Sequence, residues 1–103
     1  DVIKCGGISE CRKVCAMAQA FEKEVMVHNT RPTLATAASL HLVASISNAA
    51  RVQEFSGMRP ELNLERMFNG SLRFENGFLY VPEGPGLGLE VREEEIIRQA
   101  RGR

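Results

Sequence analysis

The sequence predicts an α/β fold in which short buried strands alternate with helices and pair in parallel. Three short apolar runs are separated by two segments with helical periodicity. The runs cover residues 1–4, 24–27 and 50–55. This alternation is typical of a parallel sheet, because each helix returns the chain to the edge where the next strand starts. The pattern ends near residue 56, so we expect two parts, residues 1–56 and 57–103.

The first helix is predicted over residues 10–22. Its apolar residues recur at steps of three and four, which places them on one helix face. They are Cys11, Val14, Cys15, Ala18 and Phe21. Ser9 is predicted to cap the helix N-terminus, and Glu10 lies in the first turn, where a carboxylate interacts favourably with the helix dipole. The preceding pair of glycines predicts a turn.

The second helix is predicted over residues 34–47, with Thr33 as its cap. Small or apolar side chains surround it on nearly every side, so we expect it to be largely buried. His41 lies in its middle between two leucines and is predicted to be packed and non-catalytic. The run at 24–27 before this helix is almost continuously apolar, which is typical of a strand covered on both faces.

The second part of the chain carries different signals. Residues 56–70 are expected to be irregular or weakly helical. The stretch 71–82 predicts a β-hairpin whose turn is Asn76-Gly77, a preferred dipeptide for two-residue hairpin turns. Residues 92–100 predict a short terminal helix.

A glycine-rich segment, residues 83–90, separates the hairpin from that helix. Its G-x-G-x-G pattern does not predict dinucleotide binding, because that motif requires a preceding strand and a helix that follows directly. We therefore expect a tight surface loop here.

The chain has 103 residues, and 13 basic residues balance 13 acidic ones. This balance argues against nucleic acid or an anionic membrane as a partner recognised by bulk charge. No apolar run approaches the roughly 18 to 20 residues of a membrane span, and no secretory signal pattern is present. We expect a cytoplasmic location.

Three cysteines, Cys5, Cys11 and Cys15, lack any C-x-x-C pair, and His28 and His41 are the only histidines. This set does not form a zinc pattern. We predict that all three cysteines are small apolar fillers in a reducing compartment.

Polar residues follow or end each predicted strand: Asp1, His28 and Glu54, at intervals of 27 and 26 residues. Equivalent ends of parallel strands lie on the same face of a sheet, and in a (β/α)₈ barrel that rim holds the active site. A carboxylate beside an imidazole fixes its tautomer, and the histidine can then act as a general base or acid. A protonated Glu54 could donate a hydrogen bond to a developing oxyanion.

Structural alternatives for these residues stay open at this point. His28 is compatible with a satisfied histidine at a loop edge, Asp1 with an exposed first residue, and Glu54 with a surface acid. Their spacing alone does not separate the two interpretations.

Several motifs in order resemble the mandelate racemase and acid-sugar dehydratase branch of the enolase superfamily. They are "DVIKCGGISECRKVCAMAQAF", "VMVHNTRPT", "ATAASLHLVASISNA", "VQEF" and "ENGFLYVPEGPGLGLEV". The resemblance implies strands six to eight of a (β/α)₈ TIM barrel with their helices. It also implies a C-terminal hairpin and tail that pack toward a capping domain absent from this chain.

The resemblance also implies roles for individual residues. Asp1 and His28 fall on the family's His-Asp dyad, and Glu54 falls on the glutamate that hydrogen-bonds the enediolate oxygen. Asn29 and Arg31, in the same loop as His28, are expected to contact substrate. The His28-Asn29 pair resembles the sugar-acid dehydratases more than the racemase.

The family's Mg²⁺ ligands lie on strands that this chain lacks, so we expect Mg²⁺ bound by residues absent from the chain and no metal ligand within it. The expected activity is removal of the proton α to a carboxylate, followed by dehydration of a sugar acid to a 2-keto-3-deoxy acid. Alternatives are a racemase or epimerase of the same superfamily and a non-catalytic α/β interaction module. We expect the 103 residues alone to be inactive, and to form a homo-oligomer or associate with the rest of a longer parent chain.

Overall fold

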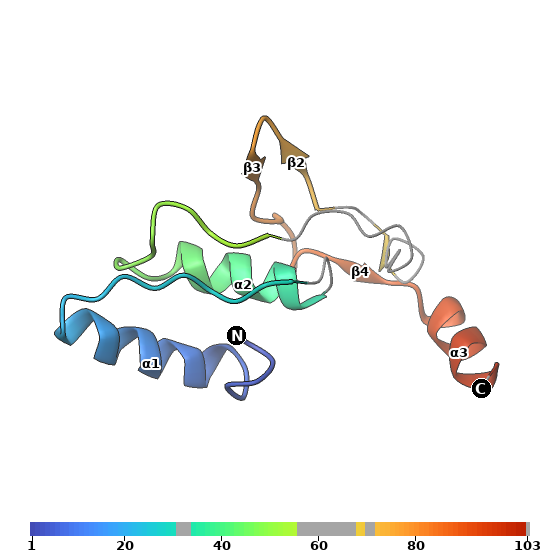
Figure 1. Ribbon diagram of the computed structural model, residues 1–103. Coiled ribbons are helices and arrows are strands. Elements are labelled where there is room, and N and C mark those ends of the chain that lie inside the picture. Colours follow the sequence, from blue (N-terminus) through green and yellow to red (C-terminus); the bar gives the residue numbers. More distant parts are fainter. Residues whose placement is uncertain (31–33, 56–67, 70–71, 103) are drawn as a thin grey trace.

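The computed structural model describes residues 1–30, 34–55, 68–69 and 72–102 (Figure 1). Its helices are α1 (Ile8–Ala20), α2 (Leu34–Ala44) and α3 (Glu93–Arg101). Its strands are β1 (Phe68–Asn69), β2 (Phe74–Glu75), β3 (Phe78–Leu79) and β4 (Glu90–Val91). Strands β1 and β4 pair antiparallel, as do β2 and β3. Helices α1 and α2 pack against each other.

Helix α1 confirms the predicted first helix but begins two residues earlier. Gly7 precedes its first residue with φ 96°, and Gly6 has φ 91°. These conformations favour glycine, and they turn the chain sharply into the helix. The prediction that Ser9 caps the helix is wrong, because Ser9 lies inside the first turn and the N-cap residue is Gly7. Glu10 does lie in the first turn.

Helix α2 is the most buried element, as predicted. Its buried residues are Thr36, Ala37, Ala38, Ser39 and Leu42. It ends at Ala44, three residues before the predicted end, where the Ser45 hydroxyl donates to the Leu42 carbonyl at 2.8 Å. Such side-chain bonds to the backbone compete with continuation of a helix. The predicted cap, Thr33, lies outside the described residues.

Residues 1–4 form a turn, so the predicted strand end is wrong here. One carboxylate oxygen of Asp1 accepts the N–H groups of Ile3 at 2.9 Å and Lys4 at 3.2 Å. The Cys5 N–H donates to the Asp1 carbonyl at 3.0 Å. These local bonds fold the backbone on itself, whereas a strand directs its groups toward a neighbour.

The segments predicted as the second and third strands run side by side but form only one parallel bridge, between Val25 and Ala49. The Val25 N–H donates to the Asn48 backbone carbonyl at 2.8 Å, and the Ala50 N–H donates to the Val25 carbonyl at 2.9 Å. The predicted parallel direction is confirmed, and the predicted regular strands are wrong. Coverage on both faces is also wrong for the first segment, since Met26 is 61% exposed while Val27 is buried.

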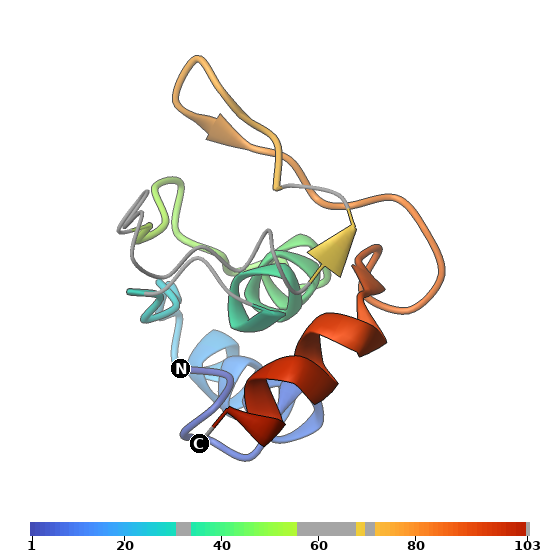
Figure 2. The same ribbon diagram turned by 90° about the vertical axis from the view of Figure 1, so that its right-hand side faces the viewer.

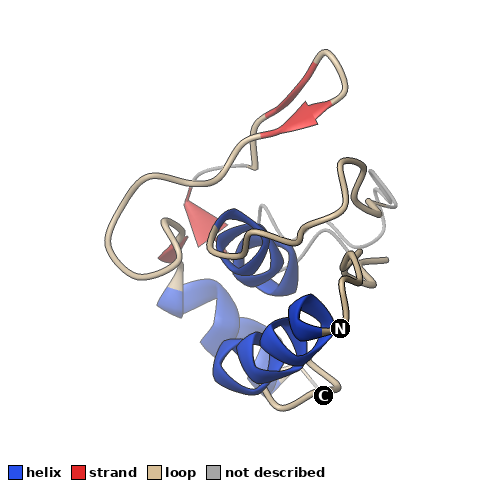
Figure 3. Ribbon diagram, turned by 90° about the vertical axis from the view of Figure 1, so that its left-hand side faces the viewer, coloured by secondary structure: helices blue, strands red, loops and turns tan. Residues whose placement is uncertain are grey.

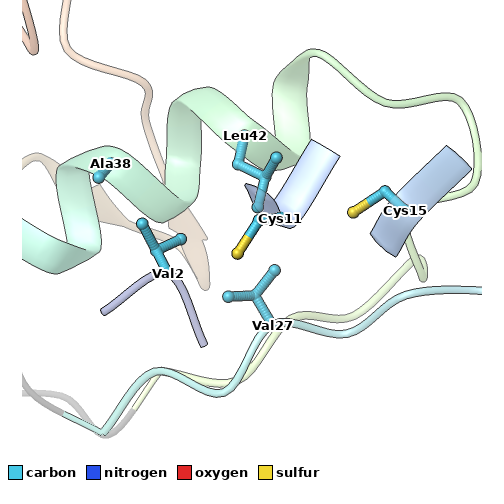
Figure 4. Close-up of a cluster of buried hydrophobic side chains, with 6 residues drawn as sticks. All are labelled: Val2, Cys11, Cys15, Val27, Ala38 and Leu42. Atoms are coloured by element: carbon cyan, nitrogen blue, oxygen red, sulfur yellow. The ribbon is translucent and has the colours of Figure 1, made fainter. Parts of the chain in front are cut away.

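The core lies between α1, α2 and these paired segments (Figure 4). It consists of Val2, Cys11, Cys15, Val27, Ala38 and Leu42. The two cysteines project from α1, Ala38 and Leu42 from α2, and Val27 from the extended segment below them. The core therefore fixes the backbone directly before residue 28, and Val2 fixes the turn that begins at residue 1.

The predicted hairpin is confirmed. Phe74 pairs with Leu79, and Glu75 pairs with Phe78, so Asn76-Gly77 forms a two-residue turn. Both turn residues have positive φ, 52° and 81°, as a type I′ turn requires. The hairpin projects away from the helices (Figures 1 and 3).

The glycine-rich loop ends in β4, a two-residue strand that the sequence pattern did not predict. Gly88 has φ 72°, and a Cβ atom there would lie 2.9 Å from the Pro82 carbonyl carbon and oxygen. Helix α3 follows and confirms the predicted terminal helix within one residue at each end (Figure 2). The irregular segment predicted between residues 56 and 70 falls almost wholly outside the described residues.

Among the described helices, none is both long and apolar enough to cross a membrane.

Candidate functional site

The structure places Asp1 against His28. The second carboxylate oxygen of Asp1, Oδ2, lies 2.9 Å from His28 Nδ1. The other oxygen, Oδ1, accepts the two N–H groups of the first turn, so the carboxylate is held at both ends. The Asp1 side chain is 18% exposed, and the His28 side chain is 49% exposed. The imidazole is therefore anchored on one side and open to solvent on the other.

This geometry sets the tautomer of a neutral His28. An ionised carboxylate only accepts hydrogen bonds, so the imidazole proton must lie on Nδ1. The lone pair of Nε2 is then available to take a proton from another molecule. The pair thus has the arrangement of an oriented general base.

The backbone around His28 is held by side chains from residues 53 and 54. Gln53 Oε1 accepts the Val27 N–H at 3.0 Å. Gln53 Nε2 donates to the carbonyls of Val25 at 3.2 Å and Ala50 at 2.7 Å. The Gln53 amide makes the hydrogen bonds that the backbone of a neighbouring strand would otherwise make. This explains why residues 25–27 and 49–53 do not form a regular ladder of backbone hydrogen bonds.

Gln53 is a residue that the sequence analysis missed. Its signal was present, because it is a polar residue between Val52 and Glu54 in a predicted strand. The alternation of a strand points it inward, on the opposite side from its exposed neighbours Val52 and Glu54. A half-buried amide there must find hydrogen-bond partners.

The Glu54 side chain contacts the site at the backbone of Asn29, not at the imidazole of His28. Its Oε2 accepts the Asn29 N–H at 2.8 Å. The three predicted residues are thus brought to one place, with Asp1 on the imidazole and Glu54 on the peptide that follows it. Glu54 itself is exposed.

Asn29 has a buried side chain, 8% exposed, whose Oδ1 accepts the hydroxyl of Thr36 at 3.0 Å. This bond joins the His28 segment to α2. The bond uses only Oδ1 of Asn29, and its predicted contact with substrate stays a prediction. Arg31, the other predicted substrate contact, lies outside the described residues.

The three cysteines are free, and only two of them fill the core. Cys11 and Cys15 are buried, as predicted. The prediction is wrong for Cys5, which is exposed because it lies in the turn before α1 and not on the helix face. His41 is half-buried, and its Nε2 lies 3.3 Å from the Leu87 carbonyl, which places it between α2 and the glycine-rich loop.

Within the described part of the chain, no group of three or more His, Cys, Asp or Glu residues is placed to hold a metal ion. The resemblance places the Mg²⁺ ligands on strands outside this chain, and the described residues do not form such a ligand set on their own. A magnesium ion would need ligands from elsewhere.

Comparison with known proteins places this chain in a family. The family model for the enolase C-terminal domain-like proteins matches residues 1–95. The chain belongs to this enolase family. The match extends from the candidate site through the glycine-rich loop into α3.

Among curated relatives of this enolase-family chain, the D-galactonate dehydratase of Cronobacter sakazakii is 29% identical over 106 residues. The match covers 99% of the chain and 28% of that relative, so the chain spans little more than a quarter of its length.

Two solved structures superpose on most of this chain. A protein from Roseobacter denitrificans, provisionally named a racemase, superposes with a TM-score of 0.85 at 32% identity, over 95% of this chain and 28% of that one. A Burkholderia xenovorans protein, provisionally named an L-alanine-DL-glutamate epimerase and bound to magnesium and fumarate, gives 0.77 at 30% identity, over 89% and 22%.

Proposed function

We propose that this chain supplies the acid/base residues of an enzyme that removes the proton α to a carboxylate and dehydrates a sugar acid. The observation that carries the proposal is the 2.9 Å contact between Asp1 and His28, which frees Nε2 for proton transfer. The sugar-acid substrate is supported by the similarity to D-galactonate dehydratase. Small-molecule chemistry also agrees with the balanced charge of the chain.

The proposed step assigns one task to each residue. His28 Nε2 accepts the α proton, and the electrons of the broken C–H bond move into the carboxylate to give an enediolate. Asp1 orients the ring and stabilises the imidazolium that forms. The His28 imidazolium then returns this proton to the β-hydroxyl, which leaves as water as the enediolate electrons form the C=C bond of an enol, and the enol tautomerises to a 2-keto-3-deoxy acid. Glu54, which lies beside the peptide that follows His28, is assigned the hydrogen bond to the enediolate oxygen, the role that the family resemblance implies.

We propose that the parent protein binds Mg²⁺ through residues outside this chain. The magnesium in the Burkholderia structure supports this assignment, and the described residues offer no cluster of ligands of their own. The 103 residues alone are therefore expected to be inactive with added Mg²⁺. Turnover of sugar acids by the purified chain, without a complementing chain, would contradict this expectation.

The second candidate is a racemase or epimerase of the same superfamily. It is favoured by the names of the Roseobacter and Burkholderia structures, which resemble this chain as closely as the dehydratases do. In that reaction His28 would exchange the α proton, and no hydroxyl would leave.

The test uses the full-length protein with Mg²⁺ and a panel of sugar acids in D₂O, followed by mass spectrometry. Loss of one water supports the dehydratase, and deuterium uptake without that loss supports the racemase. The variant His28→Asn is expected to abolish both signals. The matched control His41→Asn, in α2, is expected to retain them, and an active His28→Asn variant would remove His28 from the mechanism.

A further inference from the structure

We propose that Cys5 and Cys11 form a reversible dithiol–disulfide site at the N-terminal end of α1, beside the turn that carries Asp1. Neither cysteine takes part in the function proposed above. Cys5 is exposed and Cys11 is 5% exposed, so the pair combines one accessible thiol with one sheltered thiol. Such an arrangement lets a small oxidant reach the pair from one side only.

The two residues converge on one backbone atom. The Cys5 N–H donates to the Asp1 carbonyl oxygen at 3.0 Å. The Cys11 thiol donates to the same oxygen at 3.8 Å. The turn that joins them is tight. Gly6 and Gly7 both have positive φ, and the Gly7 N–H donates to the Val2 carbonyl at 2.8 Å. The chain therefore returns Cys5 to the first turns of the helix.

The neighbouring Cys5 also influences the Cys11 thiol. Burial raises the pKa of Cys11, and the charge and hydrogen bond of the neighbouring Cys5 thiol raise this pKa further. Cys15, one turn along α1, also raises the pKa of Cys11, but its influence is the smallest of these. Because Cys5 and Cys11 meet at the Asp1 carbonyl oxygen, Cys5 is the partner assigned to Cys11, and Cys15 is the natural comparison.

The reaction is a thiol–disulfide exchange with a small-molecule disulfide, RSSR. The Cys5 thiolate attacks one sulfur of RSSR, forming a mixed disulfide and releasing RS⁻. Cys11 gives its proton to solvent and attacks the Cys5 sulfur, which forms the Cys5–Cys11 bond and releases the second RS⁻. Two protein thiols are oxidised and RSSR is reduced to two thiols, so the exchange reverses with excess thiol.

The test starts from fully reduced protein incubated with oxidised glutathione, then blocked with an alkylating reagent. We expect an intact mass that has lost two hydrogens before alkylation, a single alkyl group on Cys15 after it, and proteolytic peptides that join Cys5 to Cys11. The Cys15→Ser variant should react in the same way, whereas Cys5→Ser and Cys11→Ser should not form an intramolecular bond. Added dithiothreitol should restore the starting mass.

Peptide mapping of the unsubstituted protein keeps the test decisive even if Cys11→Ser fails to fold. A bond from either residue to Cys15, a stable glutathione adduct on Cys5 alone, or only a disulfide between two chains would each overturn the proposal.

Discussion

The side-chain amide of Gln53 lies along the backbone at Val27, accepting the Val27 N–H at 3.0 Å and donating to the Val25 carbonyl at 3.2 Å. His28 is the next residue, so its position depends on this amide. Removing the amide leaves the partly buried Val27 N–H and the Ala50 carbonyl without this partner, while the Val25 carbonyl keeps the Ala50 N–H, and one such loss costs about 1–3 kcal/mol. We expect Gln53→Ala to lower the free energy of unfolding by that amount in urea denaturation.

The matched control for this prediction is Gln19→Ala, which removes the same side chain from the exposed surface of α1. Its effect should be close to zero or slightly stabilising, because alanine favours helix formation. Equal losses in the two variants would show that the Gln53 amide contributes nothing specific.

The carboxylate of Asp1 should control which nitrogen of His28 carries the proton. In Asp1→Asn, the amide oxygen should take the place of Oδ1, because that atom accepts the N–H groups of Ile3 and Lys4. The amide NH₂ would then face His28 Nδ1, which must become an acceptor. We expect the proton of the neutral ring to move to Nε2, as read from ¹⁵N chemical shifts of the imidazole.

His41 serves as the internal control in the same spectra, since its Nε2 interacts with the Leu87 carbonyl, away from Asp1. Its shifts should not change. An unchanged tautomer of His28 in the variant would mean that the 2.9 Å contact does not govern the ring.

Two glycines of the glycine-rich loop allow backbone strain to be separated from crowding. Gly86 and Gly88 both have positive φ, 64° and 72°, but a Cβ on Gly86 meets no atom within 4 Å. A Cβ on Gly88 would lie 2.5 Å from the Pro82 Cβ. We expect Gly86→Ala to cost about 1–2 kcal/mol from the left-handed conformation. Gly88→Ala should cost about 1–3 kcal/mol more, because the loop must move.

Thermal unfolding followed by circular dichroism measures both variants. Similar melting temperatures for Gly86→Ala and Gly88→Ala would contradict the predicted crowding against Pro82.

An apolar stripe on α1 should drive association of the isolated chain. Val14 and Met17 lie on one face of α1 and Phe21 directly follows its last residue; they are 54%, 65% and 74% exposed. An apolar surface of this kind is usually covered in solution. We expect light scattering to show masses that rise with concentration, and Met17→Gln with Phe21→Gln to reduce them. Arg12→Gln on the same helix should leave association unchanged, and a strictly monomeric unsubstituted chain would refute the prediction.

The elements that the sequence predicted well are those with local causes. Helix α1 follows from one apolar face after two glycines, and the hairpin follows from Asn76-Gly77. The regular strands failed because the deciding contacts are non-local: the Gln53 amide meets residues 25 and 27, far away in the sequence. An apolar run indicates burial, but it does not reveal which polar group will hydrogen-bond to its backbone.

The candidate site divides in the same way. Equal spacing predicted that Asp1, His28 and Glu54 meet, and the structure places them together. The spacing could not indicate that Glu54 binds a peptide N–H next to His28, nor that Asn29 turns toward Thr36. Side-chain direction at the end of a strand depends on packing against α2, which the sequence pattern does not specify.

The single bridge between Val25 and Ala49 has a consequence for the order of folding. The bridged segments enclose α2 alone, so this unit can close as soon as residue 54 has left the ribosome. The β1–β4 pair joins residues on either side of the hairpin and the glycine-rich loop, so it must form later in synthesis. Because both partners of the Val25–Ala49 bridge are synthesised before β4, the histidine segment can be in place while the C-terminal helix is still being made.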